Sequence, residues 1–176
     1  MHNIQIDSEF QALIPPLSAE ERAQLEANLL ADGCRDPLVV WGDVLVDGHN
    51  RHEICTRHGL PFEVVAREFD SREDVVVWMV DNQRGRRNLN DFQRTELQLK
   101  KKSAIAAKAR SNQQGGQGGV LLPANSPKAI DTRKEIAAAA GVGENTVSKV
   151  ERIQETAAPE LVTALRESKV SINAAA

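Results

Sequence analysis

The 176-residue sequence contains few aromatic side chains, few cysteines and no long apolar run. Aromatic residues make up 3% of the chain, so aliphatic side chains and alanine must form most of any core. The two cysteines, Cys34 and Cys55, are too few for a disulfide framework. No stretch matches a membrane span or a signal peptide. These absences exclude integral membrane and disulfide-rich secreted classes and indicate a cytoplasmic protein without a membrane partner.

The charge is unevenly distributed, although the net charge of the whole chain is only −3. Residues 1–83 contain 6 basic and 16 acidic side chains, whereas residues 84–112 contain 9 basic and 2 acidic ones. Phosphates respond to nearby charge, because salt screens distant charge, so the basic middle is informative about partners. Such a block is either a solvated helix face or a surface that contacts phosphates.

Residues 132–153, TRKEIAAAAGVGENTVSKVERI, show the strongest local pattern. Apolar residues recur at helical spacing on both sides of Gly141, where a sharp turn favours glycine. The predicted inward-facing residues are Ile136, Ala137, Ala140, Val142, Val147 and Val150. Asp131 or Thr132 is the expected cap of the first helix. The pattern predicts two short helices joined by a tight turn.

The second of these helices presents a polar outward face. Amides, hydroxyls and cations can reach base edges and phosphates in a major groove. We expect DNA contacts from Asn145, Thr146, Ser148, Lys149 and Arg152, with phosphate contacts from Lys100, Lys101 and Lys102 in the basic region. An ordinary pair of helices with a solvated face is the alternative. The joint agreement of six core positions and the turn glycine favours a DNA-binding helix-turn-helix.

Residues 1–85 are predicted to form a small mixed α/β domain. The β-branched run at residues 75–77 would suit a strand as well as a helix. The first expected elements are an edge strand at residues 4–6 and a helix from Ser18 to Gly33, with Leu25, Leu29 and Leu30 facing inward. A hairpin of residues 38–41 and 44–46 should follow, and then a helix that ends at His58. The last expected elements are a strand at residues 62–69 and a helix from Ser71 to Val80 or Asn82.

Residues 86–176 are predicted to be helical. A helix at residues 91–110 begins at a cap, Asn90 or Asp91, and its Phe92, Leu97 and Ile105 should contact neighbouring elements. The glycine-, glutamine- and proline-rich residues 111–130 should form a flexible segment. After the helix-turn-helix at residues 132–153, Pro159 should open a short helix to about Ser168, and Ser171 should begin another.

A second signal lies at residues 47–51, DGHNR, where the hairpin passes into a helix. A helix that starts directly after glycine has free N–H groups, which can bind an anion, and Arg51 adds a cation. A plain strand-to-helix turn is the alternative. His49, His52, Cys55 and His58 recur every three residues, but each such step rotates about 300° along a helix. They cannot all converge on one ion, so no metal site is predicted, and Cys55 should be a buried apolar residue.

The run VLVDGHNRHEICTRHGLPFEVVAREF, followed by MVDNQRGRRNLNDFQR and then the helix-turn-helix, resembles the ParB family. The resemblance extends over residues 14–174. It implies an α+β protein, with a ParB/sulfiredoxin-like domain at residues 1–85 and an all-α DNA-binding domain at residues 86–176. It also implies that the chain is a fragment of a longer protein whose C-terminal dimerisation part is missing.

The resemblance further implies a nucleotide site in the N-terminal domain, usually for CTP with Mg²⁺. The implied phosphate contacts are Gly48, His49, Asn50 and Arg51, with Asn82, Arg84 and Arg87 as a second set. The family usually has glutamate and arginine where this chain has His49 and Asn50. His49 also replaces the catalytic cysteine of sulfiredoxin, which disfavours that redox phosphotransfer chemistry.

Two functions are consistent with these patterns. The first is a sequence-specific DNA-binding protein of the ParB type, acting in plasmid or chromosome partition or in transcriptional regulation. Such a protein would bind double-stranded DNA as a homodimer, associate with the nucleoid or a plasmid, and work with a partition ATPase. The second is an enzyme, a nucleotide hydrolase or nuclease built on residues 48–51. No carboxylate cluster compels that second interpretation, and no catalytic residue is assigned.

Overall fold

The computed structural model describes residues 4–84, 89–114 and 132–176. The chain divides into two compact units, Met1–Met79 and Val80–Ala176, and the division falls within helix α4 (Arg72–Arg84). The first unit contains the strands and the second is helical, which confirms the predicted α+β class. The domain boundary expected between residues 85 and 86 lies outside the described residues, as does most of the segment at 111–130. Within the described ranges, no helix is both long and apolar enough to cross a membrane.

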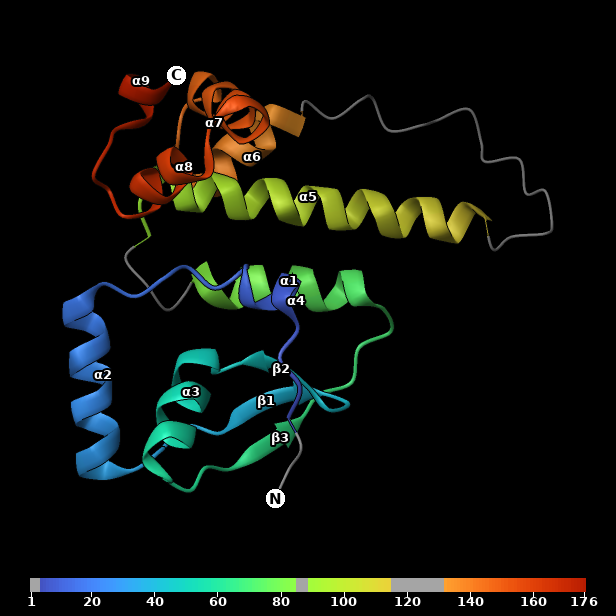
Figure 1. The fold of residues 1–176 in the computed structure, drawn as a ribbon. Helices are drawn as coiled ribbons and strands as arrows, with labels where there is room; N and C mark the ends of the chain where they lie inside the picture. The colour runs from blue at the N-terminus through green and yellow to red at the C-terminus, as the bar shows by residue number, and fades with distance from the viewer. Residues whose placement is uncertain (1–3, 85–88, 115–131) are drawn as a thin grey trace. The chain divides into compact units, whose positions relative to one another are not determined.

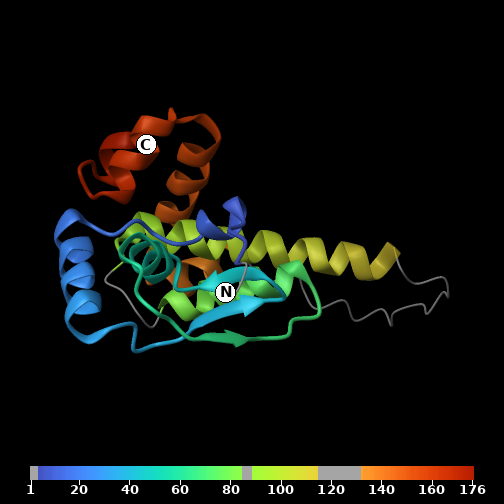
Figure 2. The same cartoon turned by 60° about the horizontal axis from the view of Figure 1, so that its bottom comes forward.

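The first unit is built on a three-stranded sheet of β1 (Leu38–Trp41), β2 (Val44–Asp47) and β3 (Val64–Ala66), shown in Figure 1. Its order is β2-β1-β3, with β1 antiparallel to β2 and parallel to β3. Figure 2 shows the strands side by side. The predicted hairpin is confirmed. The strand predicted at residues 62–69 is too long, because only Val64–Ala66 pair with the short strand β1. The edge strand expected at residues 4–6 is a single bridge, Gln5 with Val44.

Helices α1 (Ser8–Gln11), α2 (Ala19–Asp32) and α3 (His49–His58) complete the described part of this unit, together with most of α4. The capping box at Ser18 is present, and the end of α2 at Gly33 is confirmed. The prediction for Leu30 is wrong. Leu29 is buried, whereas Leu30 is 53% exposed, because Leu30 lies about 100° around the helix from Leu29 and outside the stripe of α2 that packs against Ile54 and Cys55.

The second unit consists of α5 (Asp91–Gln114), α6 (Thr132–Ala140), α7 (Glu144–Thr156), α8 (Pro159–Arg166) and α9 (Ile172–Ala175) in its described part. Helix α5 continues past its predicted end, since the first glycine comes only at residue 115. Ile105 does not make the expected core contact and is 53% exposed, because the fully buried positions of α5 all precede residue 99.

The cores around α6 and α7 agree with the predicted pattern. Phe92 packs with Val150, Ile153 and Leu165, and a second cluster joins the two helices of the turn. The predicted inward residues Ile136, Ala137, Ala140, Val147 and Val150 are buried, and Val142 packs partly buried against them. The start of α5 is therefore the base on which α6, α7 and α8 pack.

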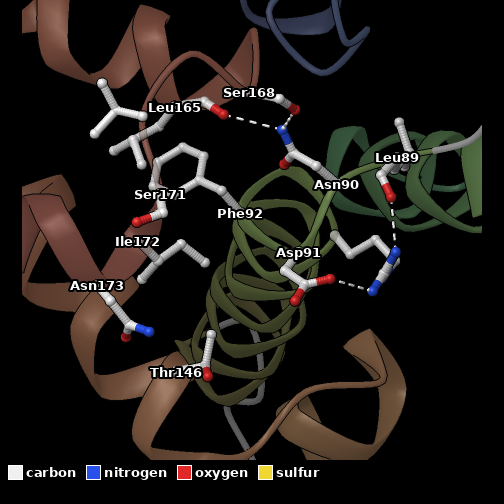
Figure 3. A pocket seen from close by; sticks show the side chains of 12 residues that line it. Leu89, Asn90, Asp91, Phe92, Thr146, Leu165, Ser168, Ser171, Ile172 and Asn173 are labelled. Atoms are coloured by element: carbon white, nitrogen blue, oxygen red, sulfur yellow. Dashed lines mark hydrogen bonds and ion pairs between the residues drawn. The ribbon is translucent and has the colours of Figure 1, made fainter.

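Asn90 joins the start of α5 to the end of α8 (Figure 3). Its Oδ1 accepts from the Gln93 N–H at 2.9 Å, and Gln93 Oε1 accepts from the Asn90 N–H at 3.0 Å, which caps α5 reciprocally. Its Nδ2 donates to the Leu165 carbonyl at 2.9 Å, the Arg166 carbonyl at 3.2 Å and Ser168 Oγ at 2.8 Å. One amide thus satisfies backbone groups at both helix ends.

A charged pair makes the second link between α5 and α8. Arg166 Nη2 and Nε lie 2.5 and 3.0 Å from the two carboxylate oxygens of Glu96, whose side chain is 9% exposed. The hydrogen bond with Glu96 raises the pKa of Arg166. The carboxylate is nearly buried, so removing this guanidinium would leave a buried group without its bidentate partner.

Replacing Arg166 by alanine should lower the free energy of unfolding by about 1–3 kcal/mol, because Glu96 would lose its bidentate partner while remaining mostly buried. Arg133→Ala is the matched control, since Arg133 pairs with Glu151 at 3.3 Å on the surface and should change stability by less than about 0.5 kcal/mol. Urea denaturation measures both. Equal effects of the two substitutions would show that the Glu96–Arg166 link does not stabilise the unit.

Candidate nucleic-acid interface and anion site

A tight turn joins α6 to α7. Gly141 has φ +68°, and the Val142 N–H donates to the Ala137 carbonyl at 3.0 Å, which closes the end of α6. Arg94 Nε donates to the Ala140 carbonyl at 2.7 Å. Arg94 thus fixes the end of α6 from the side of α5. This role was not predicted, because the sequence around an arginine in a basic region does not indicate a carbonyl partner that is distant in the chain.

Helix α7 divides into a buried and a polar face. Val147, Val150 and Ile153 are buried, whereas the residues predicted to meet DNA all lie outside the core. Asn145 and Arg152 are exposed, and Thr146, Ser148 and Lys149 are half-buried. Among the described residues, no ion pair involves the Arg152 guanidinium. The helix therefore offers amide, hydroxyl and cationic groups along one surface.

The structure gives several predicted DNA-contacting residues partners within the protein. Lys149 Nζ donates to Asn173 Oδ1 at 2.7 Å, which ties α7 to α9, and Ser148 Oγ donates to the Glu144 carbonyl at 3.3 Å. Within the basic region of α5, Lys102 is exposed. Lys101 binds both Asp81 carboxylate oxygens at 2.7 and 2.8 Å, and Lys100 lies 4.0 Å from a Glu96 carboxylate oxygen.

A pocket of about 600 Å³ lies beside α7 within the same unit (Figure 3). Thr146 of α7 is one of its lining residues. The others are Leu89, Asn90, Asp91, Phe92, Arg94, Leu165, Ser168, Val170, Ser171, Ile172 and Asn173. The two charged groups, Asp91 and Arg94, already pair with each other at 2.5 Å. The lining residues therefore offer no cluster of free acids or bases for catalysis.

The turn before α3 requires glycine. Gly48 has φ +95°, and a Cβ there would lie 2.5 Å from Leu38 Cδ2 and 3.1 Å from Arg51 Nη2. Gly48 occupies the cap position of α3 but supplies no side-chain hydrogen bond. The first N–H groups of a helix have no partner within the helix, and a glycine at the cap position has no side chain to accept from them.

Arg51 points back into the protein. Its Nη2 binds Asp47 Oδ2 at 3.1 Å and its Nη1 donates to the Asp36 carbonyl at 2.8 Å. The Arg51 side chain is 14% exposed and that of Asp47 is 7% exposed. The guanidinium predicted to meet phosphate therefore stabilises the turn from beneath. Asn50, by contrast, is half-buried at the start of α3.

His49 is buried without a hydrogen-bond partner. It is 7% exposed, and neither ring nitrogen has a partner among the described residues. Burial lowers its pKa to about 4, although the Asp47 carboxylate opposes the shift. The imidazole is therefore neutral near pH 7. The neighbouring His52 ring packs edge-on against the Phe62 ring. Within the described residues, no three metal-ligating side chains converge on one point.

The second set of predicted nucleotide contacts belongs to a different part of the chain. Asn82 is half-buried on α4, within the second unit. The Arg84 side chain and Arg87 lie outside the described residues. Cys55 is fully buried, as predicted, and packs beside Cys34. Gly48, His49, Asn50 and Arg51 therefore lie together at the start of α3. The nucleotide contacts expected from Asn82, Arg84 and Arg87 stay a prediction.

The depressed pKa of His49 makes stability depend on pH. The unfolded state, with a pKa near 6.5, binds the proton more readily than the folded state, with a pKa of about 4. Stability is therefore complete above the unfolded value and is lost as the pH falls from 6.5 to about 4. His49→Leu should remove about 3 kcal/mol of the loss between pH 7 and 4. Urea denaturation at both pH values measures this, and an equal acid loss in both proteins would contradict it.

Comparisons with known proteins identify the fold. No protein-family model matches the chain, and no curated protein matches its sequence. A solved structure of a Pnob8-like ParB-N domain has a TM-score of 0.63 and 22% identity, covering 97% of this chain and 73% of that one. A pNOB8-like ParB N-domain has a TM-score of 0.60 and 24% identity, covering 97% and 69%. At such identities the similarity concerns structure, and the chain has the fold of a ParB N-domain.

Proposed function

We propose that the chain is a DNA-binding protein of the ParB type, in which α7 is the recognition helix. The arrangement of α7 is the main support. One face is locked into the core by Val147, Val150 and Ile153, and the remaining surface is polar, with the cations Lys149 and Arg152 alongside the exposed carboxylates Glu144 and Glu155. A rigidly held helix of this composition can present side chains to base edges without reorganising first. The similarity in fold to ParB N-domains adds to this support.

The proposed contacts divide by chemistry. Asn145, Thr146 and Ser148, near the start of α7, would reach base edges, because the N-terminal residues of a recognition helix enter the groove first. Lys149 and Arg152 would bind phosphates. Lys149 would have to exchange its bond with Asn173 for a charge-assisted bond to phosphate, which is the stronger interaction. Exposed Lys102 could add a phosphate contact along α5.

Partition and assembly follow from the same proposal. Sequence-specific proteins with a single recognition helix usually bind two half-sites as dimers. We therefore propose that the functional form is a homodimer on double-stranded DNA, within the nucleoid or on a plasmid, and that a partition ATPase is a partner. A transcriptional role would use the same DNA contacts.

The direct test is selection of bound DNA from a random pool, with and without CTP. Enrichment of a defined site supports the DNA-binding proposal, and a change in enrichment with CTP supports nucleotide control. Failure to enrich any sequence under either condition would contradict sequence-specific binding.

Lys149→Ala combined with Arg152→Ala should weaken binding to the selected site by about 10- to 100-fold at moderate salt, because two phosphate contacts are lost. The slope of log affinity against log salt should also fall by about 1.8, which is roughly 0.9 for each contact. Fluorescence anisotropy over a salt series measures both quantities.

The matched control is Gln154→Ala with Glu155→Ala. Both side chains are exposed on α7 but are outside the proposed contact set, and removing them should not reduce affinity. If the Lys149 and Arg152 variant remains folded and binds with unchanged affinity, α7 is not the recognition helix.

We further propose that the start of α3 binds the phosphates of a nucleotide, for which CTP with Mg²⁺ is the first candidate. The residues fit such a group in two respects. The cap position of α3 is a glycine, which has no side chain to accept from the first N–H groups, and such groups could donate to phosphate. His49 also leaves two buried ring nitrogens without partners beside this terminus. When bound, the nucleotide would place a negative charge near the N-terminus of α3, where the helix dipole stabilises it.

Arg51 would act indirectly in this site. Because it already binds Asp47 and the Asp36 carbonyl, it would hold the turn in shape while the backbone and Asn50 meet the phosphates. This division of roles makes Asn50 the informative position. A carboxylate at this position would interact favourably with the dipole of α3 but would repel a phosphate.

Asn50→Asp should therefore leave stability unchanged, or raise it by about 0.3–1 kcal/mol, while lowering CTP affinity by at least roughly tenfold through repulsion. Isothermal titration calorimetry and urea denaturation give the two values. Thr56→Asp adds the same charge on an exposed position near the other end of α3 and should retain CTP binding. Equal CTP affinity in the two variants would place the nucleotide elsewhere.

A further inference from the structure

Cys34 and Cys55 come together from different elements of the first unit. Cys34 directly follows Gly33, the residue that ends α2, and Cys55 lies on α3. These two helices contact each other, as Figure 1 shows. Cys34 packs against a buried cluster formed by Leu29, Ile54 and Cys55. The end of α2 therefore brings one thiol against the other.

The two thiols differ in their access to solvent. Cys55 is fully buried, whereas Cys34 is half-buried. Burial, and after it the adjoining Cys34 thiol, raise the pKa of the Cys55 thiol to about 11. Cys55 is thus protonated near neutral pH and shielded from oxidants in solution. A soluble oxidant would reach Cys34 first.

Cys34 is also connected to the turn at the start of α3. Its Sγ donates to the Asp36 carbonyl at 3.4 Å, and Arg51 Nη1 donates to the same carbonyl at 2.8 Å. Arg51 in turn binds Asp47. A change at the Cys34 sulfur would therefore act on a carbonyl that helps to position Arg51.

We propose that Cys34 and Cys55 are a redox-active thiol pair that closes to an intramolecular disulfide in the presence of hydrogen peroxide. The Cys34 sulfur attacks one peroxide oxygen, the O–O bond breaks, and Cys34 becomes a sulfenic acid with release of one water. The Cys55 sulfur then attacks the Cys34 sulfur and an S–S bond forms. The sulfenic hydroxyl leaves with the Cys55 proton as a second water. The two thiols are oxidised by two electrons, and the peroxide is reduced to two waters.

Closure would change the local contacts in a defined way. The end of α2 would be joined covalently to α3, and the Cys34 S–H would no longer donate to the Asp36 carbonyl. Arg51 Nη1 would remain a donor to that carbonyl. A dithiol reductant would restore both thiols, so the change is reversible.

The test treats the full 176-residue chain with one equivalent of hydrogen peroxide under native conditions. The chain contains only two cysteines, so a monomer whose mass has fallen by two hydrogen atoms identifies the bond without ambiguity. We expect this species to form, the titratable thiols to fall from two to none, and dithiothreitol to reverse both changes. Monomer that retains two thiols, or that oxidises only to disulfide-linked dimers, would overturn the proposal.

Two single variants separate the roles of the thiols. Cys55→Ser should stop at the Cys34 sulfenic acid, which dimedone captures as a stable adduct. Cys34→Ser should keep Cys55 reduced, because the remaining thiol is buried. Circular dichroism confirms that each variant is folded before oxidation. If dimedone labels Cys55 in native Cys34→Ser as readily as it labels Cys34 in native Cys55→Ser, the assigned order of oxidation is wrong.

Discussion

The start of α5 is the constraint on which the helical unit depends. Asn90 binds the carbonyls at the end of α8, Phe92 fills the core beneath α7, Arg94 binds the end of α6 through Ala140, and Glu96 holds α8 through a charged pair. These contacts come from less than two turns of one helix. Each polar partner is a helix-end carbonyl or a charge that would be costly to leave unsatisfied. Together they hold the elements around α7 in a single arrangement.

The turn at Gly48 has a comparable role in the first unit. Only glycine fits its backbone conformation and its contact with Leu38. The turn also includes a group that is unfavourable for stability, a buried imidazole without partners, beside the nearly buried Arg51–Asp47 pair that holds the turn. Such unfavourable groups concentrate where a protein must keep chemical groups ready for a ligand. This tendency is a physical argument for the proposed nucleotide site at the turn.

Much of the architecture was predictable from local pattern. The capping box at Ser18, the hairpin, the glycine turn at Gly141 and the inward face of α7 were all predicted and are present. The predictions failed where an adjacent apolar residue was assigned to the same face, as at Leu30, or where a helix extends past its packing partners, as at Ile105. Hydrophobicity alone does not tell where the neighbouring element ends.

Local sequence was enough to predict the α+β class, the order of the main elements, the α7 face that packs inward and the glycine at the turn of residue 141. Periodicity and backbone sterics act within a few residues, so a local stretch contains the information. Which polar groups and thiols already have partners within the protein became apparent only from the folded structure. Lys149 binds Asn173, Arg51 binds the Asp36 carbonyl, and Cys34 meets Cys55. These partners are distant in the chain or lie across a turn. They meet because burial of apolar surface brings whole elements together, and that effect is not directional enough to be read from a single segment.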